Sequence, residues 1–180
     1  SLVDEETEVA DAAHAQTLRH QGGSIEFRHV SFGYESERTI LHNISFSIAP
    51  GTTAAIVGPT GSGKSTISRL LLRFYDPQSG NILIDSQDLL DLTQHSLRQA
   101  IGVVPQDTVL FNDTLYYNIA YGDPKADEDR ILDAAKAAQL DDFIKRLPGG
   151  YQTVVGERGL KLSGGEQQRV AIARALLRDP

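Results

Sequence analysis

One short stretch constrains the fold more than any other. Residues 58–65 read Gly-Pro-Thr-Gly-Ser-Gly-Lys-Ser, which matches the phosphate-loop pattern G-x-x-x-x-G-K-[ST] at each fixed position. The apolar residues 53–57 that precede it have the length of a buried strand. After it, the apolar positions of residues 67–74 recur at the spacing of one helix face. A strand, a glycine-rich turn and a helix start together predict an anion-binding loop; the alternative is a glycine-rich turn without a ligand.

The residues of this loop differ in their expected roles. The glycines let the backbone turn tightly and point several N–H groups at one anion, and the helix dipole adds partial positive charge there. Lys64 is placed to reach the β- and γ-phosphates of a nucleotide, and the Ser65 hydroxyl to ligate Mg²⁺. The predicted nucleotide contacts are Gly58, Thr60, Gly61, Ser62, Gly63, Lys64, Ser65 and Thr66.

Composition sets outer limits on the function. A chain of 180 residues with 40% hydrophobic content suggests one soluble domain. Its net charge of −7 argues against general nucleic-acid binding. The absence of cysteine excludes a disulfide framework and a thiolate metal site. No apolar run reaches the roughly 18 residues of a membrane span. Because the chain also lacks methionine, we expect its first residue to result from cutting or processing.

The chain around the loop shows an acidic start and an antiparallel layer. Residues 1–23 carry five acidic side chains before Arg19 and end in two glycines, which is typical of a solvated linker; a partner-binding tail is the alternative. Alternating apolar residues predict strands at 25–30 and 44–48. These two strands suggest an antiparallel β-layer at the edge of the nucleotide site. Further strands are predicted at 81–85 and 101–104.

Later residues follow a helical pattern. We expect a short helix near 95–100 and a helix through Ile119 that Asp113 or Thr114 caps. A further helix starts at Ala126 or Asp127. The remaining predicted helices lie around 143–147 and at 167–177.

A second glycine-rich helix start opens the last of these helices. Residues 162–169 read Leu-Ser-Gly-Gly-Glu-Gln-Gln-Arg. The Ser163 hydroxyl and the N–H groups of Gly164 and Gly165 form another possible anion site; a capped helix with a glycine turn is the alternative. This stretch resembles the signature motif of ABC-type ATPases, L-S-G-G-x-Q-x-R. With the phosphate loop, it makes residues 24–180 similar to that family.

Other positions also match the family pattern. Tyr34 resembles the A-loop aromatic residue that stacks on adenine, a contact that needs the ring and not the hydroxyl; its alternative is an ordinary strand-end tyrosine. Gln106 resembles the Q-loop glutamine, which touches Mg²⁺ together with Ser65; its alternative is a surface glutamine. Glu157 and Arg158 resemble the segment that exporters place against their transmembrane helices; a plain turn is the alternative.

Finer features resemble one subgroup of the family. Residues 111–114, 118–122 and 156–162 look like exporter half-transporters of the mitochondrial and heavy-metal-tolerance type and their bacterial relatives. Those export glutathione-linked sulfur, iron–sulfur or metal species. Glu166 stands where the commonest family pattern has glutamine, and a carboxylate near a phosphate is unfavourable. We therefore expect Glu166 to belong to the signature contact but to point away from the phosphate.

One aspartate superficially resembles a catalytic group. Residues 82–85 form an apolar run ending in Asp85, as in a Walker B motif, but Ser86 follows where a catalytic glutamate is needed. The histidines show no metal spacing. In the family, the Walker B aspartate, catalytic glutamate and switch histidine all follow the signature helix. We therefore place no catalytic residue within this chain and expect the chain alone to be inactive.

The resemblance implies an α/β fold of the phosphate-loop NTPase (RecA-like) type. It would contain an antiparallel β-subdomain and an inserted α-helical subdomain near 107–165, with the C-terminal part of the domain missing. Residues 24–180 would be the N-terminal portion of an ABC nucleotide-binding domain. Residues 1–23 would be a linker from a preceding transmembrane domain.

The resemblance also implies cofactors, partners and location. The cofactors are ATP and Mg²⁺, and in the intact parent ATP hydrolysis drives export. Two identical or homologous cassettes pack head to tail, so each ATP lies between one phosphate loop and the opposite signature, Ser163 to Glu166. The other partner is the transmembrane domain of the same parent, and no nucleic-acid partner is implied. The cassette would lie on the cytoplasmic side of a bacterial membrane or on the matrix side of a mitochondrial membrane. The alternatives are a soluble ABC-type ATPase of DNA repair or translation and a non-hydrolysing ATP-binding fragment.

Overall fold

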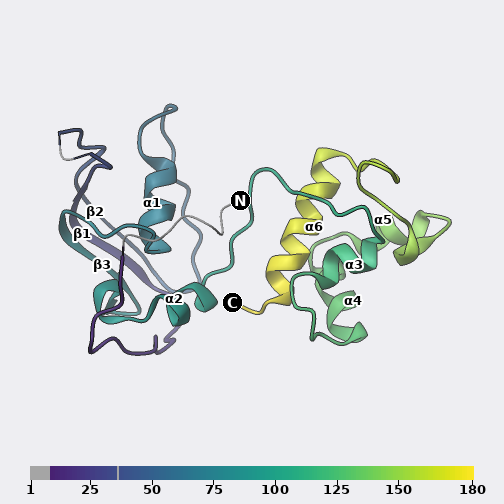
Figure 1. The fold of residues 1–180 in the computed structure, drawn as a ribbon, viewed down its shortest axis with the longest axis horizontal. Helices are drawn as coiled ribbons and strands as arrows, with labels where there is room; N and C mark the ends of the chain where they lie inside the picture. Colours follow the sequence, from purple (N-terminus) through teal and green to yellow (C-terminus); the bar gives the residue numbers. More distant parts are fainter. Residues whose placement is uncertain (1–8, 36) are drawn as a thin grey trace. The chain divides into compact units, whose positions relative to one another are not determined.

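The computed structural model describes residues 9–35 and 37–180. The chain forms two compact units, Ser1–Ile101 and Gly102–Pro180, each described by itself below (Figure 1). The first contains β1 (Ile25–Phe32), β2 (Leu41–Ile48), α1 (Lys64–Leu71), β3 (Ser79–Ile84), β4 (Gln87–Asp88), the 3₁₀ turn η1 (Leu89–Asp91) and α2 (Gln94–Ala100). The second contains α3 (Leu115–Ala120), α4 (Glu128–Ala137), α5 (Asp141–Arg146), the 3₁₀ turn η2 (Gly150–Gln152) and α6 (Gly164–Leu177). None of the helices in the described ranges combines the length and apolar character that crossing a bilayer requires.

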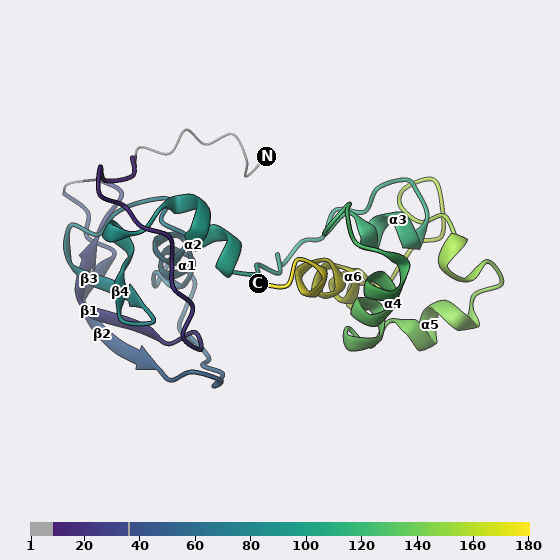
Figure 2. The ribbon, with the colours of Figure 1, turned by 90° about the horizontal axis from the view of Figure 1, so that it is seen from below.

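The first unit is built on an antiparallel sheet of strand order β2-β1-β3-β4. Helices α1 and α2 lie on one side of this sheet (Figure 2). Phe27 of β1 is buried in the core of this unit with Leu70 of α1 and Leu97 of α2. Phe27 also stacks on Phe46 of β2, with the ring centroids 4.6 Å apart. The predicted antiparallel layer is confirmed, because β1 pairs antiparallel with β2 on one side and with β3 on the other.

Two predicted strands are not formed. Residues 53–57 and 101–104 contain no strand, and neither segment pairs with another among the described residues. Ile56 and Val57 before the phosphate loop are exposed, as are Val103 and Val104. A strand persists only when a neighbouring strand satisfies its backbone N–H and C=O groups. The apolar pattern marks these segments as strand-like, but the pairing they need is not provided within the described chain.

The segment before β1 is attached to the first unit. Gln16 pairs with Leu92 in an isolated parallel bridge, and the N–H of Leu18 donates to Ser96 Oγ over 3.0 Å. The expected solvated linker therefore hydrogen-bonds to the folded unit over its described residues, 9–23; residues 1–8 lie outside the described residues. This attachment could not be predicted from side-chain patterns, because most of these bonds involve the backbone of the segment.

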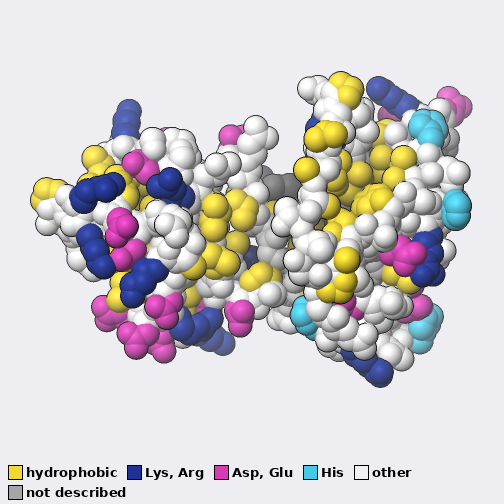
Figure 3. Space-filling model, turned by 180° about the vertical axis from the view of Figure 1, so that it is seen from behind, with side chains coloured by type: hydrophobic (Ala, Val, Ile, Leu, Met, Phe, Trp, Pro, Cys, Tyr) yellow, Lys and Arg dark blue, Asp and Glu magenta, His cyan; other side chains and the backbone are white. Residues whose placement is uncertain are grey.

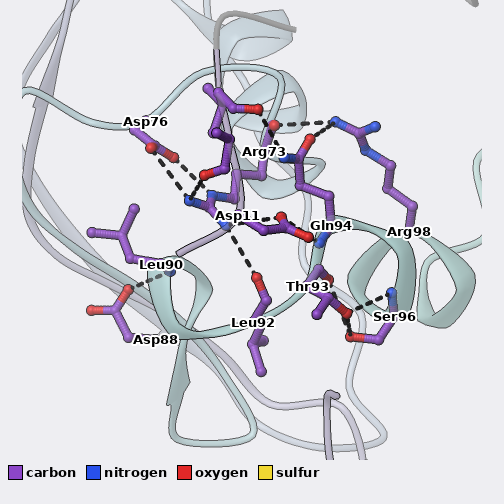
Figure 4. A network of polar contacts seen from close by, with 12 residues as sticks. Asp11, Arg73, Asp76, Asp88, Leu90, Leu92, Thr93, Gln94, Ser96 and Arg98 are labelled. Atoms are coloured by element: carbon purple, nitrogen blue, oxygen red, sulfur yellow. Dashed lines mark hydrogen bonds and ion pairs between the residues drawn. The ribbon is translucent and has the colours of Figure 1, made fainter. Parts of the chain in front are cut away.

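One buried arginine joins this segment to the end of α1. Arg73 is only 3% exposed. Its guanidinium donates to Asp76 over 2.9 Å, to the carbonyl of Leu92 over 3.1 Å and to the carbonyl of Ala10 over 3.4 Å (Figure 4). Asp11 lies 3.8 Å from the same guanidinium. These partners compensate the cost of burying the charge and fix where α1 ends.

The second unit is helical and has its own core. Thr114 caps α3 and Asp127 caps α4, so both predicted helix starts are confirmed. The last helix begins three residues earlier than predicted, at Gly164, because Ser163 caps it. Arg174 of α6 donates to the carbonyl of Asn118 over 2.6 Å and to its side-chain oxygen over 2.8 Å. Asn118 is fully buried, so this pair fixes α6 against α3.

Candidate functional site

The glycine-rich loop leaves the start of α1 open. Gly63 forms the N-cap in the left-handed conformation, with φ 91°, and no side chain caps α1. A Cβ at Gly63 would lie 2.7 Å from Leu41 Cδ2, so only glycine fits there. The first N–H groups of a helix have no partner within the helix. The loop therefore presents unsatisfied N–H groups together with the positive end of the helix dipole, which is what an anion needs.

Lys64 supplies the cation of this loop. Its ammonium group folds back and donates to the backbone carbonyls of Gly58 and Pro59, the latter over 2.8 Å. The charge thus stays within the loop even without a ligand. Ser65 is exposed beside it, whereas Thr66 is buried.

Tyr34 lies against α1, close to this loop. The residue is 40% exposed, and its ring meets Phe32 and Tyr75 edge-on, at centroid distances of 5.1 and 5.0 Å. Its hydroxyl contacts Thr66 Oγ1 at 3.1 Å and accepts a hydrogen bond from Arg69 over 2.9 Å. The structure therefore brings Tyr34 and the phosphate-loop helix together. Sequence reasoning missed Arg69, because its contact with Tyr34 spans 35 residues and follows no helix or strand period.

Gln106 belongs to the second unit. It is exposed and lies in a segment without regular secondary structure, after the unformed strand 101–104. Within the described residues of the second unit, no hydrogen bond or ion pair holds its side chain. Its role toward Mg²⁺ stays a prediction.

At the second glycine-rich helix start, no other described part of the chain packs against the two glycines. Gly164 and Gly165 open α6 without positive φ, and a Cβ added to either would meet nothing within 4 Å. Glycine weakens a helix by about 0.5–1 kcal/mol relative to alanine. The chain itself therefore has no steric need for these glycines. They leave open space above the helix start, where a group from outside can approach the backbone closely.

The Glu166 side chain folds back onto this helix start, whereas the sequence predicts that it points away from a phosphate bound there. Its carboxylate accepts a hydrogen bond from the N–H of Ser163 over 2.7 Å, and Ser163 Oγ accepts one from the N–H of Glu166 over 3.3 Å. This reciprocal pair is a capping box. The expectation was wrong because it considered only repulsion from a phosphate, whereas the unsatisfied N–H groups attract the carboxylate.

Glu157 and Arg158 lie beside a groove of the second unit. The N–H of Arg158 donates to Asn112 Oδ1 over 3.1 Å, which holds the turn that Gly156 opens with φ 95°. The groove, about 350 Å³ in volume, is lined by Thr108, Val109, Leu110, Gly156, Glu157, Lys161, Leu162 and Gln167. Val109 is strongly exposed, and the buried hydroxyl of Thr108 has no hydrogen-bond partner. The turn is thus fixed in place next to a partly apolar groove.

Asp85 is occupied elsewhere. Its buried carboxylate accepts hydrogen bonds from the N–H groups of Gln21, Gly23 and Ser24, over 2.6–2.8 Å. Burial raises the pKa of this carboxyl, but these hydrogen bonds outweigh it, so the net pKa lies below the ordinary value. Asp85 therefore fastens the segment before β1, which agrees with its exclusion as a metal ligand. The described residues hold no cluster of three metal-ligating side chains, and the histidines are scattered over the first unit (Figure 3).

Comparisons with known proteins place these features in a family. Residues 41–180 match the protein family described as ABC transporter. The chain is 59% identical to an ATM1-type heavy metal exporter of Novosphingobium aromaticivorans, over 99% of this chain and 29% of that protein. It is 58% identical to the mitochondrial iron-sulfur clusters transporter atm1 of Aspergillus fumigatus, over 89% of this chain and 22% of that protein.

Solved structures give the same result. The structure of a bacterial Atm1-family ABC exporter with ATP bound superposes with a TM-score of 0.87 at 59% identity, covering 99% of this chain and 31% of that one. This likeness confirms the α/β phosphate-loop NTPase fold class. The chain spans less than a third of the length of these relatives.

Proposed function

Because the chain belongs to the ABC transporter family, we propose that it is the ATP-binding portion of the nucleotide-binding domain of an Atm1-type exporter. The observation that carries this proposal is the open start of α1, where unsatisfied N–H groups face the same loop as the Lys64 ammonium. The relatives are named as an exporter and a transporter, which disfavours a soluble ATPase of DNA repair or translation.

The loop residues fit MgATP. Lys64 is placed to exchange its two carbonyl contacts for the β- and γ-phosphates, and the bare helix start to bind the same oxygens. Ser65, with its exposed hydroxyl, would hold Mg²⁺, with Gln106 as a second contact. When bound, the metal neutralises charge on the phosphates. The remaining loop contacts proposed are Gly58, Thr60, Gly61, Ser62, Gly63 and Thr66.

The second glycine-rich start supports a partner cassette. The open space above Gly164 and Gly165 has no use within the chain, and glycines there cost helix stability. A phosphate bound to the loop of a second cassette would use that space, with Ser163 as hydrogen-bonding group. The proposal is therefore a head-to-tail dimer of identical or homologous cassettes.

The groove beside Glu157 and Arg158 supports coupling to a membrane domain. An exposed valine, a fixed turn and an unsatisfied buried hydroxyl are features of a surface that another segment covers. We assign it to the transmembrane domain of the parent protein, with residues 1–23 as the connecting linker. The parent would lie in a bacterial membrane with the cassette in the cytoplasm, or in a mitochondrial membrane with the cassette in the matrix.

The proposed activity of the parent is ATP hydrolysis that drives export. The names of the relatives mention heavy metals and iron-sulfur clusters, so the proposed cargo class is metal- or sulfur-containing, including glutathione-linked species. The groups that activate water and hold the metal from its far side are proposed to lie outside residues 1–180. A binding module without turnover is the rival, and ATPase measurement of the complete protein separates the two.

The test of ATP binding is Lys64→Ala in the complete protein. We expect a large loss of ATP affinity by calorimetry with an unchanged circular dichroism spectrum, because Lys64 contacts only exposed loop carbonyls. Arg28→Ala removes one positive charge from the exposed sheet surface and serves as control. Unchanged ATP affinity in a folded Lys64→Ala variant would contradict the proposal.

A further inference from the structure

The Tyr34 ring is fixed by more than ring packing. Phe32 and Tyr75 meet it edge-on, which leaves 40% of the residue exposed. Its hydroxyl is bound at the other end, to Thr66 and Arg69 of α1. A ring that only stacks on a base does not need its hydroxyl, so these two bonds call for another explanation.

Both hydroxyl partners belong to the helix that starts at the phosphate loop. Thr66 is the second residue after Lys64, and its buried hydroxyl lies 3.1 Å from that of Tyr34. Arg69 follows one turn later, donates to Tyr34 over 2.9 Å and places its guanidinium carbon 5.7 Å from the ring centroid. A hydrogen bond from a charged donor is stronger than one between neutral groups. The ring is therefore held at a set position relative to the phosphate loop.

We infer that Arg69, together with Thr66, is a positioning residue that holds Tyr34 as the adenine platform at a fixed distance from the phosphate loop. This inference rests on the proposed function. Adenine and triphosphate belong to one ligand. When the Tyr34 ring is already fixed to the phosphate-binding helix, adenine can stack on it while the phosphates occupy the loop, and binding does not cost the entropy of ordering the ring. Arg69 acts through Tyr34 and does not touch the phosphates in this role.

If Arg69 and Thr66 have this role, the Tyr34 hydroxyl contributes to the affinity for ATP but not to the affinity for inorganic triphosphate. Stacking by itself predicts no loss for Tyr34→Phe, since the ring is kept. The hydroxyl contacts predict a loss, since the ring is no longer tied to α1. An arginine that served only as surface charge, or that bound the phosphates, would affect inorganic triphosphate as much as ATP.

The experiment measures magnesium-dependent binding of ATP and of inorganic triphosphate by the complete protein. The variants are Arg69→Ala, Arg69→Lys, Tyr34→Phe and the double variant Arg69→Ala/Tyr34→Phe, with Arg28→Ala as the charge control. We expect Arg69→Ala and Tyr34→Phe each to weaken ATP binding by about three- to tenfold. The affinity for inorganic triphosphate should not change in these variants. Arg69→Lys should lose less ATP affinity than Arg69→Ala, because lysine keeps a charged donor. The double variant should bind ATP about as well as either single variant.

Two outcomes would overturn the inference. One is an equal loss for ATP and triphosphate in Arg69→Ala. The other is wild-type ATP affinity in both single variants. If wild type binds ATP and Lys64→Ala does not, either outcome overturns the role of Arg69 alone. If wild type fails to bind ATP, the proposed function itself is wrong.

Discussion

The N–H of Ser163 donates to the carboxylate of Glu166 over 2.7 Å, so a negative charge lies at the N-cap of α6. The same helix start is the proposed site of the partner's γ-phosphate. The carboxylate bonds the Ser163 N–H, directly beside the N–H groups of Gly164 and Gly165 that the proposed phosphate would use, and two negative charges this close repel each other. We therefore expect Glu166 to stabilise the free helix and to disfavour the proposed phosphate-bound dimer.

Glu166→Gln should therefore strengthen ATP-dependent dimerisation of the complete, hydrolysis-deficient protein. Glutamine keeps an acceptor for the Ser163 N–H and removes the charge. Sedimentation at several ATP concentrations measures the effect, and Glu166→Ala is the matched control that removes the cap as well. That alanine variant should lose about 0.5–1 kcal/mol of unfolding free energy. Dimers of Glu166→Gln no stronger than wild type would show that the carboxylate does not compete.

Gly165→Ala should separate folding from dimer formation. A Cβ at Gly165 meets nothing within 4 Å, so the helix should gain about 0.5–1 kcal/mol of stability from the better helix former. In the proposed dimer the same Cβ lies against a phosphate, so ATP-dependent dimerisation should fall while ATP binding to a single cassette stays. Thermal unfolding and sedimentation measure the two effects.

A matched control is Gly156→Ala, at a glycine with φ 95° whose Cβ would lie 2.6 Å from Asn112 Oδ1. That variant should be destabilised. Equally stable dimers of Gly165→Ala and wild type would count against a phosphate above this helix start.

The sequence predicted those parts of the molecule that local rules determine. The glycine-rich loop before α1 and the two helix starts follow from short-range patterns, and of the two alternatives predicted at each start the structure has Thr114 and Asp127 as the caps. The strands predicted at 53–57 and 101–104 are not formed. An apolar pattern does not show whether a neighbouring strand is present to pair with the segment.

The contacts that sequence reasoning missed are long-range ones. Arg69 and Tyr34 are 35 residues apart, and Asp85 reaches Gly23 across 62 residues. Neither spacing follows a helix or strand period, so no local pattern could indicate them. The prediction for the Glu166 side chain failed for another reason. It considered the repulsion from a bound phosphate, whereas the orientation in the chain is set by the attraction between the carboxylate and the unsatisfied N–H groups of the helix start.

Asp85→Asn should loosen the segment before β1 and remove an acid-sensitive contribution to stability. The hydrogen bonds to Asp85 favour its ionised form, so its pKa is lower in the folded chain than in the unfolded one. The stabilisation is therefore complete above the ordinary aspartate pKa of 3.8 and is lost as the pH falls through the lower folded-state pKa. Unfolding free energy of wild type and variant should differ near neutral pH and converge below that window.

Denaturant titrations from pH 7 to pH 2 measure this convergence. Asp88→Asn is the control, since that carboxylate caps the turn η1 and does not touch the segment before β1. Hydrogen exchange of the Gly23 and Ser24 amides should rise in Asp85→Asn and not in Asp88→Asn. A difference in stability that persists unchanged at low pH would contradict the assignment to the Asp85 charge.

Residues 1–180 alone should bind ATP weakly, turn over none and aggregate. Ile56 and Val57 are 47% and 88% exposed just before the phosphate loop, and Val103 and Val104 are 54% and 44% exposed before Gln106. These strand-like apolar segments are unpaired within the described residues, so they are expected to associate between molecules. Phosphoryl transfer depends on positioning and electrostatic stabilisation, and we expect no acid of this chain to act as the water-activating group. The complete domain should bury these segments and hydrolyse ATP.

Light scattering and phosphate release, compared between the 180-residue chain and the complete domain, measure both effects. Steady turnover by the short chain that Lys64→Ala abolishes would show that the catalytic groups lie within residues 1–180.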